Sequence, residues 1–413
     1  MEKRIAALVL AACMALPLFG CGSKLTAQSL TEGVTARTID THIDLTDDST
    51  AVMDFAAALL RQTTKEEGVL LSPVSLLYAL GMTANGADGA TLSQLEKAMG
   101  MDRDTLNDYL YTYRMSLPEN TKKCKLSLAN SLWVRDIFRV EDSFLDNCVS
   151  YYDAEVYRSA FDEAMKSDLN HWVSDQTDGM IDKLLEEAPG ERTMLYLVNA
   201  VCFDAKWKKP YEKENIQKGA VFTAADGTRQ TADLLWSQES LYLSDDNTTG
   251  FMKYYDGGRY AFVGLLPNEG VSITDYVAGL TGGKLHALLN DPQHGTVEAA
   301  IPRFKASSSL ELSDALKAMG VTDAFDSAAA DLRAMGGAPN DQLYVGAVLH
   351  KTYLELDENG TKAAAVTAVV TEAASAEPPE VHRVVLDRPF VYMIVDTHAN
   401  LPLFLGTVTQ MDG

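Results

Sequence analysis

The sequence has few of the residues from which catalytic and metal sites are built. Its 413 residues include only 7 His and 5 Cys. The histidines are scattered without metal-ligand spacing, and no two cysteines form a CxxC unit. The chain also lacks a GxGxxG, a P-loop, an HExxH, a GxSxG and an EF-hand loop. We therefore expect no enzyme, no metal site and no other cofactor.

Positive charge is scarce as well. Lys and Arg number 35 against 58 Asp and Glu, which gives a formal net charge of -23. A chain this acidic is soluble and is repelled by nucleic acid and by anionic surfaces. Its densest basic cluster, Lys122, Lys123 and Lys125, has the size of a solvated turn. Charge thus excludes nucleic acid as a partner.

The N-terminus carries a targeting segment. MEKR is a positively charged start, IAALVLAACMALPLF is an apolar core too short for a permanent membrane span, and LFGC ends in Cys21. This resembles a bacterial lipoprotein signal, which implies removal of residues 1–20 and lipidation of Cys21 at the cell surface. Ordinary secretion with another cleavage point is the alternative, because Phe19 replaces the small residue usual at that position.

The rest of the chain predicts one domain. Residues 21–49 are rich in Thr, Ser and Asp with little apolar periodicity, so they predict a lipid-anchored surface tether. Residues 50–413 contain no internal repeat and no linker, so they predict a single domain. Their three cysteines, Cys124, Cys148 and Cys202, are unevenly spaced and indicate no disulfide framework, although the sequence leaves one bridge among them open.

Apolar spacing within this domain changes from helical to strand-like along the chain. Helices first and strands afterwards predict an α+β domain with an antiparallel sheet. The expected helices cover 50–62, 91–99, 104–115, 143–150 and 169–186. The expected strands cover 194–203, 260–267, 296–304, 342–356, 384–396 and 401–410.

One segment, GTKAAAVTAVVTEAASAEPPE at residues 360–380, fits no ordinary category. It is too apolar for a loop, too β-branched for a helix interior and too rich in Ala for a committed strand. In an extended chain, alternate residues from Thr361 to Thr371 share one face, and none of them is charged or larger than Val. That face can enter a packed interior. Composition alone favours a flexible linker or an exposed edge strand.

Several long stretches carry a family resemblance. LLSPVSLLYALGMTANGADGAT (70–91), LNHWVSDQTDGMIDKLL (169–185) and LVNAVCFDAKWKKPY (197–211) occur in this order. ALKAMGVTDAF (315–325), VLHKTYLELDENGTKAAAVTAVV (348–370) and DRPFVYMIVDTHANLPLFLGTV (387–408) complete it. From about residue 50 to 410 the chain resembles a serpin, a serine protease inhibitor of the trapping kind.

The resemblance implies the serpin fold, with N-terminal helices packed on large, mostly antiparallel sheets and an exposed reactive-centre loop. The protease attacks the loop and forms an acyl ester, and the loop then inserts into the central sheet as a new strand, so that deacylation stalls. The hinge of the loop resembles that of inhibitory members at Glu358, Gly360, Thr361, Ala363, Ala364, Ala365 and Thr367. A non-inhibitory serpin acting as a carrier or binding protein is the alternative.

The resemblance also implies a target class. Fourteen residues beyond Gly360, the family's attacked bond falls between Ala374 and Ser375. A small residue on the acyl side indicates elastase-like serine proteases, and papain-like cysteine proteases are further targets that the same trap allows. Because the segment from Ser375 to Pro389 is longer than in many relatives, neighbouring bonds are alternatives. Ala373 and Ala376 give the same specificity, whereas Glu372 and Glu377 do not.

Further residues match the family's control of sheet opening. Ser72, Ser75, Asn199 and His350 match the polar cluster that holds the central strands together, and Trp207 matches the aromatic residue where the loop first inserts. Ordinary buried packing is compatible with each of these roles. We expect a secreted, extracellular monomer that reaches the membrane only through its lipid.

Overall fold

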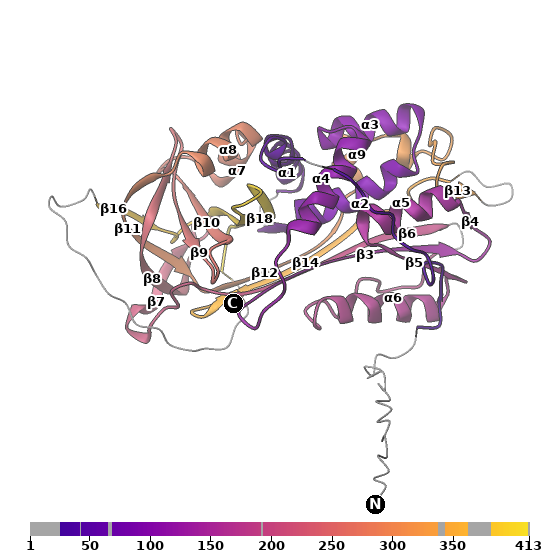
Figure 1. The fold of residues 1–413 in the computed structure, drawn as a ribbon. Coiled ribbons are helices and arrows are strands. Elements are labelled where there is room, and N and C mark those ends of the chain that lie inside the picture. Colours follow the sequence, from indigo (N-terminus) through magenta and orange to yellow (C-terminus); the bar gives the residue numbers. More distant parts are fainter. Residues whose placement is uncertain are drawn as a thin grey trace, which may run out of the picture.

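The computed structural model describes residues 25–41, 43–64, 68–190, 193–337, 343–361 and 381–411. Within these ranges, two large sheets carry most of the strands (Figure 1). Helices α2 to α5 lie on one side of the sheet that contains β3, β5 and β6, and α6 lies on its opposite side. None of the described helices is long and apolar enough to cross a membrane.

Local sequence signals set the helix boundaries. Ser72 caps α2, because its hydroxyl accepts the Ser75 N–H and Pro73 takes the first helical position. Asp162 caps α6 by accepting the N–H groups of Ala164 and Met165. The helices are α1 (Ser49–Thr63), α2 (Pro73–Asn85), α3 (Gly89–Met99), α4 (Arg103–Ser116), α5 (Asp142–Tyr152), α6 (Glu163–Gln176), α7 (Ile273–Ala278), α8 (Gly282–Asn290) and α9 (Ser313–Ala318), with short 3₁₀ turns at Lys213–Asn215 and Asp323–Phe325.

A seven-stranded sheet holds the segment of interest. Its order is β1 (Gln28–Ser29), β5 (Glu155–Ser159), β3 (Cys124–Arg135), β6 (Leu195–Lys206), β15 (Gly360–Thr361), β14 (Leu349–Leu356) and β12 (Phe304–Glu311). The β3–β5 pair is parallel, and the other pairs of this sheet are antiparallel.

A nine-stranded sheet forms the second layer. Its order is β16 (Val381–Val385), β11 (Gln293–Pro302), β8 (Arg229–Ser244), β9 (Thr248–Tyr254), β10 (Tyr260–Pro267), β17 (Phe390–Asp396), β18 (Leu401–Val408) and β2 (Val69–Leu71), with β7 (Ile216–Thr223) paired to β8. β4 (Arg139–Val140) and β13 (Gly336–Gly337) form a small third sheet. This architecture confirms the predicted α+β class with mostly antiparallel sheets.

Three expected elements have wrong boundaries, and several elements were not predicted. The helix expected at 169–186 is α6, which ends earlier because Gly179 adopts a left-handed conformation, with φ of 75°, and its N–H returns to the Ser174 carbonyl. The strand expected at 342–356 is regular only in β14, because the Val345 N–H bonds to the Ala324 carbonyl instead of to a ladder. The strand expected at 384–396 is two separate strands, β16 and β17, because Asp387 to Pro389 leave the ladder. Among the longer elements, β3, β5, β7, β8, β9, β12, α7 and α8 were not predicted.

The main core lies between the helices and both sheets. Helix α2 is buried on almost all sides and packs against β6 and β18. A second, smaller cluster of apolar side chains lies between α6 and the other face of β3 and β6, and includes Trp133, Trp172 and Val198. On β14 and β12 of the seven-stranded sheet, buried residues alternate with more exposed ones, so a strand added beside β14 needs small or apolar side chains on its buried face only.

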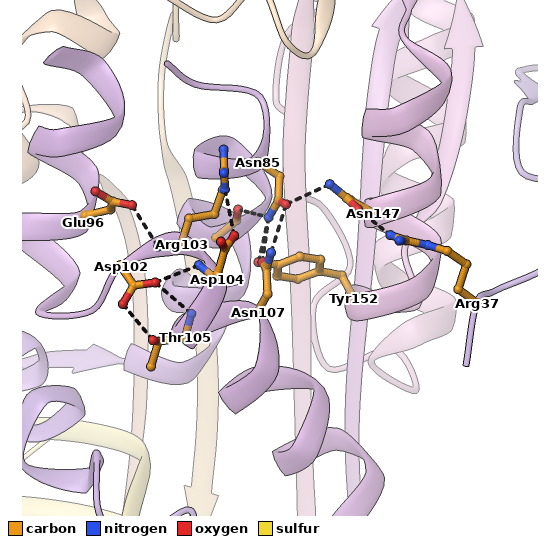
Figure 2. A network of polar contacts seen from close by, with 11 residues as sticks. Arg37, Asn85, Glu96, Asp102, Arg103, Asp104, Thr105, Asn107, Asn147 and Tyr152 are labelled. Carbon is orange, nitrogen blue, oxygen red and sulfur yellow. Dashed lines mark hydrogen bonds and ion pairs between the residues drawn. The ribbon is translucent and has the colours of Figure 1, made fainter. Parts of the chain in front are cut away.

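A buried amide network joins three helices on the α2 side (Figure 2). Asn85 of α2 donates to the Asn107 side-chain oxygen at 2.7 Å, and Asn107 of α4 donates back at 3.0 Å. The Tyr152 hydroxyl of α5 donates to the same Asn107 oxygen at 2.5 Å and accepts from Asn85 at 3.2 Å. Each polar group thus finds a partner inside the core, which fixes how α2, α4 and α5 pack.

We predict that Tyr152→Phe lowers the free energy of unfolding by about 1–2 kcal/mol, because it leaves Asn107 and Asn85 buried with one partner fewer. The measurement is urea unfolding followed by fluorescence. Tyr151→Phe, on the partly exposed neighbour, is the control and should change stability by less than about 0.5 kcal/mol. Equal effects of the two variants would contradict a role for this network in stability.

Candidate functional site

The central strands of the seven-stranded sheet are held apart by the start of the unusual segment. Gly360 pairs with Lys206 and Thr361 pairs with Ala205 of β6, while Thr361 also faces Leu356 of β14. Among the described strands no ladder joins β6 directly to β14, and β15 is their common neighbour. The sheet thus already accepts a third strand at one end of the slot between β6 and β14.

The inserted residues show which face of the segment enters the core. Thr361 is 1% exposed, and its hydroxyl lies 2.7 Å from the Tyr255 hydroxyl in a hydrogen bond. On the neighbouring strands, Ala205 and Leu356 are fully buried on the same side. Thr361 therefore lies on the inward face of the sheet.

Gly360 is required by a close approach of two backbones. A Cβ at this position would lie 2.1 Å from the Ala205 carbonyl oxygen and 2.7 Å from the Cα of Lys206. No side chain fits in that space, so only glycine lets the segment enter the slot at this point.

Trp207 holds the turn that precedes the inserted strand. Its indole N–H donates to the Asp357 carbonyl and its backbone N–H to the Asn359 carbonyl, both at 2.9 Å. The ring stacks on Tyr255, with centroids 4.4 Å apart. Glu358 is held from the outside by the Arg303 guanidinium at 2.7 Å. The turn between β14 and β15 is thus fixed on both sides of the slot.

A buried ion pair packs against the Trp207 ring. The Lys253 ammonium is 3% exposed and binds the Glu239 carboxylate at 2.9 Å. It also lies 5.4 Å from the Trp207 ring centroid and 4.3 Å from that of Tyr211. Burial lowers the pKa of Lys253, and Glu239 opposes that shift. The Tyr211 N–H in turn donates to the Glu358 carbonyl, so this pair is linked to the same turn.

The other end of the slot contains a small cavity. It measures about 30 Å³, enough for one water molecule, and is lined by β6, β14 and α2, including Ser75, Asn199 and His350. The Ser72 N–H donates to His350 Nε2 at 3.0 Å, which joins the start of α2 to β14. Burial lowers the pKa of His350 from 6.5 to about 4, so the imidazole is neutral and able to accept this bond.

The predicted polar cluster is only partly connected. Ser72 and His350 bond directly, and Ser75 joins them through the Ser72 hydroxyl. Asn199 lines the same cavity, but its amide donates to the side-chain oxygen of Asn130 on β3 at 2.5 Å. The Asn199 side-chain oxygen has no hydrogen-bond partner among the described groups. The cluster therefore has two halves that face each other across the slot.

Several residues at this site were missed in the sequence. Asn130 lies on β3, Lys253 and Tyr255 lie in and directly after β9, and Arg303 lies between β11 and β12; none stands in a motif. The available signal for Lys253 was one charged residue within an otherwise apolar strand. The positions of Ala363, Ala364, Ala365, Thr367, Ala374, Ser375 and Cys21 lie outside the described residues.

Comparison with known proteins agrees with this geometry. The family described as "Serpin (serine protease inhibitor)" matches residues 50–411. The chain belongs to the serpin family. Neuroserpin from Gallus gallus is 29% identical to this serpin over 365 residues, which are 84% of this chain and 87% of neuroserpin.

Solved serpin structures share the fold. The native state of tengpin, a thermophilic serpin, has a TM-score of 0.87 at 39% identity and covers 93% of this chain and 100% of its own. Its latent state, at 37% identity, covers 92% of this chain and 100% of its own with a TM-score of 0.79. Human thyroxine-binding globulin, in complex with its ligand, has a TM-score of 0.79 at 25% identity over 90% of this chain and 100% of its own. The serpin fold expected from the sequence is thereby confirmed.

We predict that acid weakens this serpin partly through His350. The folded state lowers its pKa, so the unfolded chain takes up the proton first, and stability is lost as pH falls from about 6.5 towards 4. The loss amounts to about 2 kcal/mol between pH 7 and pH 5. Urea unfolding at both pH values should show a smaller difference for His350→Gln, while the exposed control His294→Gln should behave as the parent. An unchanged pH difference in His350→Gln would disprove the assignment.

We predict that Gly360→Ala destabilises the hinge end of the sheet by about 1–3 kcal/mol, because the new methyl group overlaps the β6 backbone. Hydrogen exchange of the Thr361 amide should accelerate, and the midpoint of urea unfolding should fall. Gly346→Ala is the matched control, since Gly346 is exposed and a Cβ there meets nothing within 4 Å. Unchanged exchange at Thr361 would show that the close approach is not a constraint.

Proposed function

We propose that this serpin is a suicide-substrate inhibitor of extracellular serine proteases, with elastase-like enzymes as its targets. The observation that carries the proposal is the position of Gly360 and Thr361 between β6 and β14. The loop that follows is of the small, uncharged kind that can continue along the same slot.

The register of β15 specifies where further residues pair once the loop is inserted. Each step along the loop moves one residue back along β6, from Lys206 at Gly360 and Ala205 at Thr361. In the inserted state that we propose, the loop continues this ladder and pairs Ala363 with Phe203 and Thr367 with Asn199. On the other side, extension of the ladder that begins at Leu356 of β14 would pair Thr367 with His350.

This register brings a hydroxyl to the polar end of the slot. In the inserted state Thr367 stands between Asn199, whose side-chain oxygen has no partner among the described groups, and His350. Ala363 falls between Phe203 and Leu354, where a small side chain is needed because both neighbours are buried. Size and polarity along the loop therefore suit the slot residue by residue.

The chemistry follows from acyl transfer. The protease serine Oγ adds to the Ala374 carbonyl carbon, and its proton passes to the amine of Ser375 as the Ala374–Ser375 bond breaks. An ester then joins the protease to the loop up to Ala374. The freed loop end inserts as a strand and displaces the attached protease, so its oxyanion hole no longer supports attack by water on the ester. Papain-like cysteine proteases form the equivalent thioester and are secondary targets.

The same proposal includes location and partners. Lipidation of Cys21 would hold a monomeric inhibitor at the outer cell surface, and ordinary secretion would release it. The net charge of -23 gives no support to a nucleic-acid partner. The second candidate function, a non-inhibitory binding protein, is favoured by the similarity to thyroxine-binding globulin, which was solved with thyroxine bound.

The deciding experiment mixes the purified protein with pancreatic or neutrophil elastase. We expect a covalent complex that survives denaturing electrophoresis. We also expect a released C-terminal fragment whose mass matches a chain that begins at Ser375. Elastase activity should be lost in proportion to the complex formed. Cleavage without a complex, with elastase still active, would favour the non-inhibitory alternative or a different target.

A matched pair of variants tests insertion itself. Ala363→Arg should turn the inhibitor into a substrate, because Arg has no space between Phe203 and Leu354. Elastase should then cleave the loop as fast as in the parent but yield at least tenfold less complex. Lys362→Arg, one position away on the opposite face, is the control and should inhibit as the parent does. Normal complex yield from Ala363→Arg would refute insertion in this register.

A further inference from the structure

Part of the segment expected to be a free tether is bound to the body. The Thr26 N–H and hydroxyl and the Ala27 N–H all donate to one carboxylate oxygen of Asp168, at 2.8, 2.6 and 2.8 Å. Asp168 lies on α6 and is only 8% exposed. A carboxylate so deeply buried needs donors, and these three satisfy it.

Apolar and strand contacts extend this docking in both directions. Leu25 and Ala27 pack on the cluster between α6 and the sheet. Gln28 and Ser29 form β1 along the edge of β5. Further on, Arg37 binds the Asp146 carboxylate of α5 at 2.5 Å, and Figure 2 shows it beside the buried amide network. The segment is thus attached at several points from Leu25 to Arg37.

This docking shortens the link to the predicted anchor. Leu25 is four residues beyond Cys21. Four residues span at most about 14 Å when fully extended. A free chain from Cys21 to Ser49 would instead have a root-mean-square length of about 30 Å. The distance between the body and its anchor is therefore set by where Leu25 docks.

We infer that the docked segment holds the α6 side of this serpin next to the lipid surface, an inference that rests on the anchoring proposed above. Helix α6 lies on the same side of the sheet as the docked Leu25, and α3 lies on the other side (Figure 1). The anchored molecule therefore presents α3 to the medium and α6 to the membrane.

The hinge end of the slot lies far from the docked segment, measured along the direction of β6. Through β5 and β3, Ser29 is level with Tyr196 near the start of β6, whereas Gly360 pairs with Lys206 at its end. Ten residues of strand separate the two levels, which is about 33 Å. The hinge is thus displaced along the lipid surface, where a protease from the medium reaches it.

Charge indicates that the short link, not adhesion, keeps α6 near the lipid. Asp162, Glu163 and Asp175 lie exposed on or beside α6, against Lys166 on the same helix, while Asp178 pairs with Lys125. An acidic face is repelled by an anionic bilayer. The protein without an anchor should therefore not bind phosphatidylglycerol vesicles.

The test attaches the chain from Gly22 onward to phosphatidylcholine vesicles through a hexahistidine segment and a nickel-chelating lipid. A fluorophore is placed on Ser167→Cys of α6 or on Lys97→Cys of α3, both exposed, in a Cys124→Ser background. Headgroup quenchers should reduce the α6 signal severalfold more than the α3 signal. Equal quenching at the two positions would overturn the inference.

Two double-proline variants test whether the docked segment, and not the anchor alone, sets the orientation. Thr26→Pro with Ala27→Pro removes all three donors to Asp168, so the difference between the two labels should fall by at least half. Thr35→Pro with Ala36→Pro, at exposed positions of the same segment, should keep the difference. A difference that survives loss of the donors would also overturn the inference. Because the anchor is synthetic, absence of natural lipidation or of elastase inhibition would leave this result unchanged and would count only against the proposed function.

Discussion

The architecture depends on the two residues that Gly360 and Thr361 insert between β6 and β14. They separate two strands that no described ladder joins, and they pair with β6 on one side and β14 on the other. Gly360 makes the insertion sterically feasible, and the hydrogen bond between Thr361 and Tyr255 gives the inserted chain a polar partner inside the core. The Trp207 indole N–H donates a hydrogen bond to the turn before them, so the strand begins from a fixed point.

Stability at the two ends of the slot has different origins. At the hinge end, aromatic stacking and the Lys253–Glu239 pair surround the turn with buried, fully paired charge. At the far end, a neutral His350 and the capping Ser72 join α2 to β14, while Asn199 belongs to the β3 side. A slot that is closed at one end and weakly connected at the other favours strand addition from the hinge.

Local patterns predicted much of the fold, and they failed where distant contacts decide the outcome. The helices near 50–62, 91–99 and 104–115 were expected close to α1, α3 and α4, because apolar spacing and caps are local properties. The strand β3 was missed since its pairing with β6 comes from a segment some seventy residues away. The docking of residues 25–37 was missed because a polar segment does not indicate which distant group will accept its N–H groups. Here that acceptor is the buried carboxylate of Asp168.

The sequence by itself determined the acidic charge, the absence of catalytic motifs, the α+β class and, through the family resemblance, the serpin fold. Tertiary structure alone decided that Asn199 pairs with Asn130 and stands apart from His350, that Arg303 and Tyr255 belong to the hinge, and that Asp168 captures the N-terminal segment. The physical reason is that periodicity and size act between neighbours in the chain. The partner of a buried polar group is set by which strands and helices the completed core brings within hydrogen-bond distance.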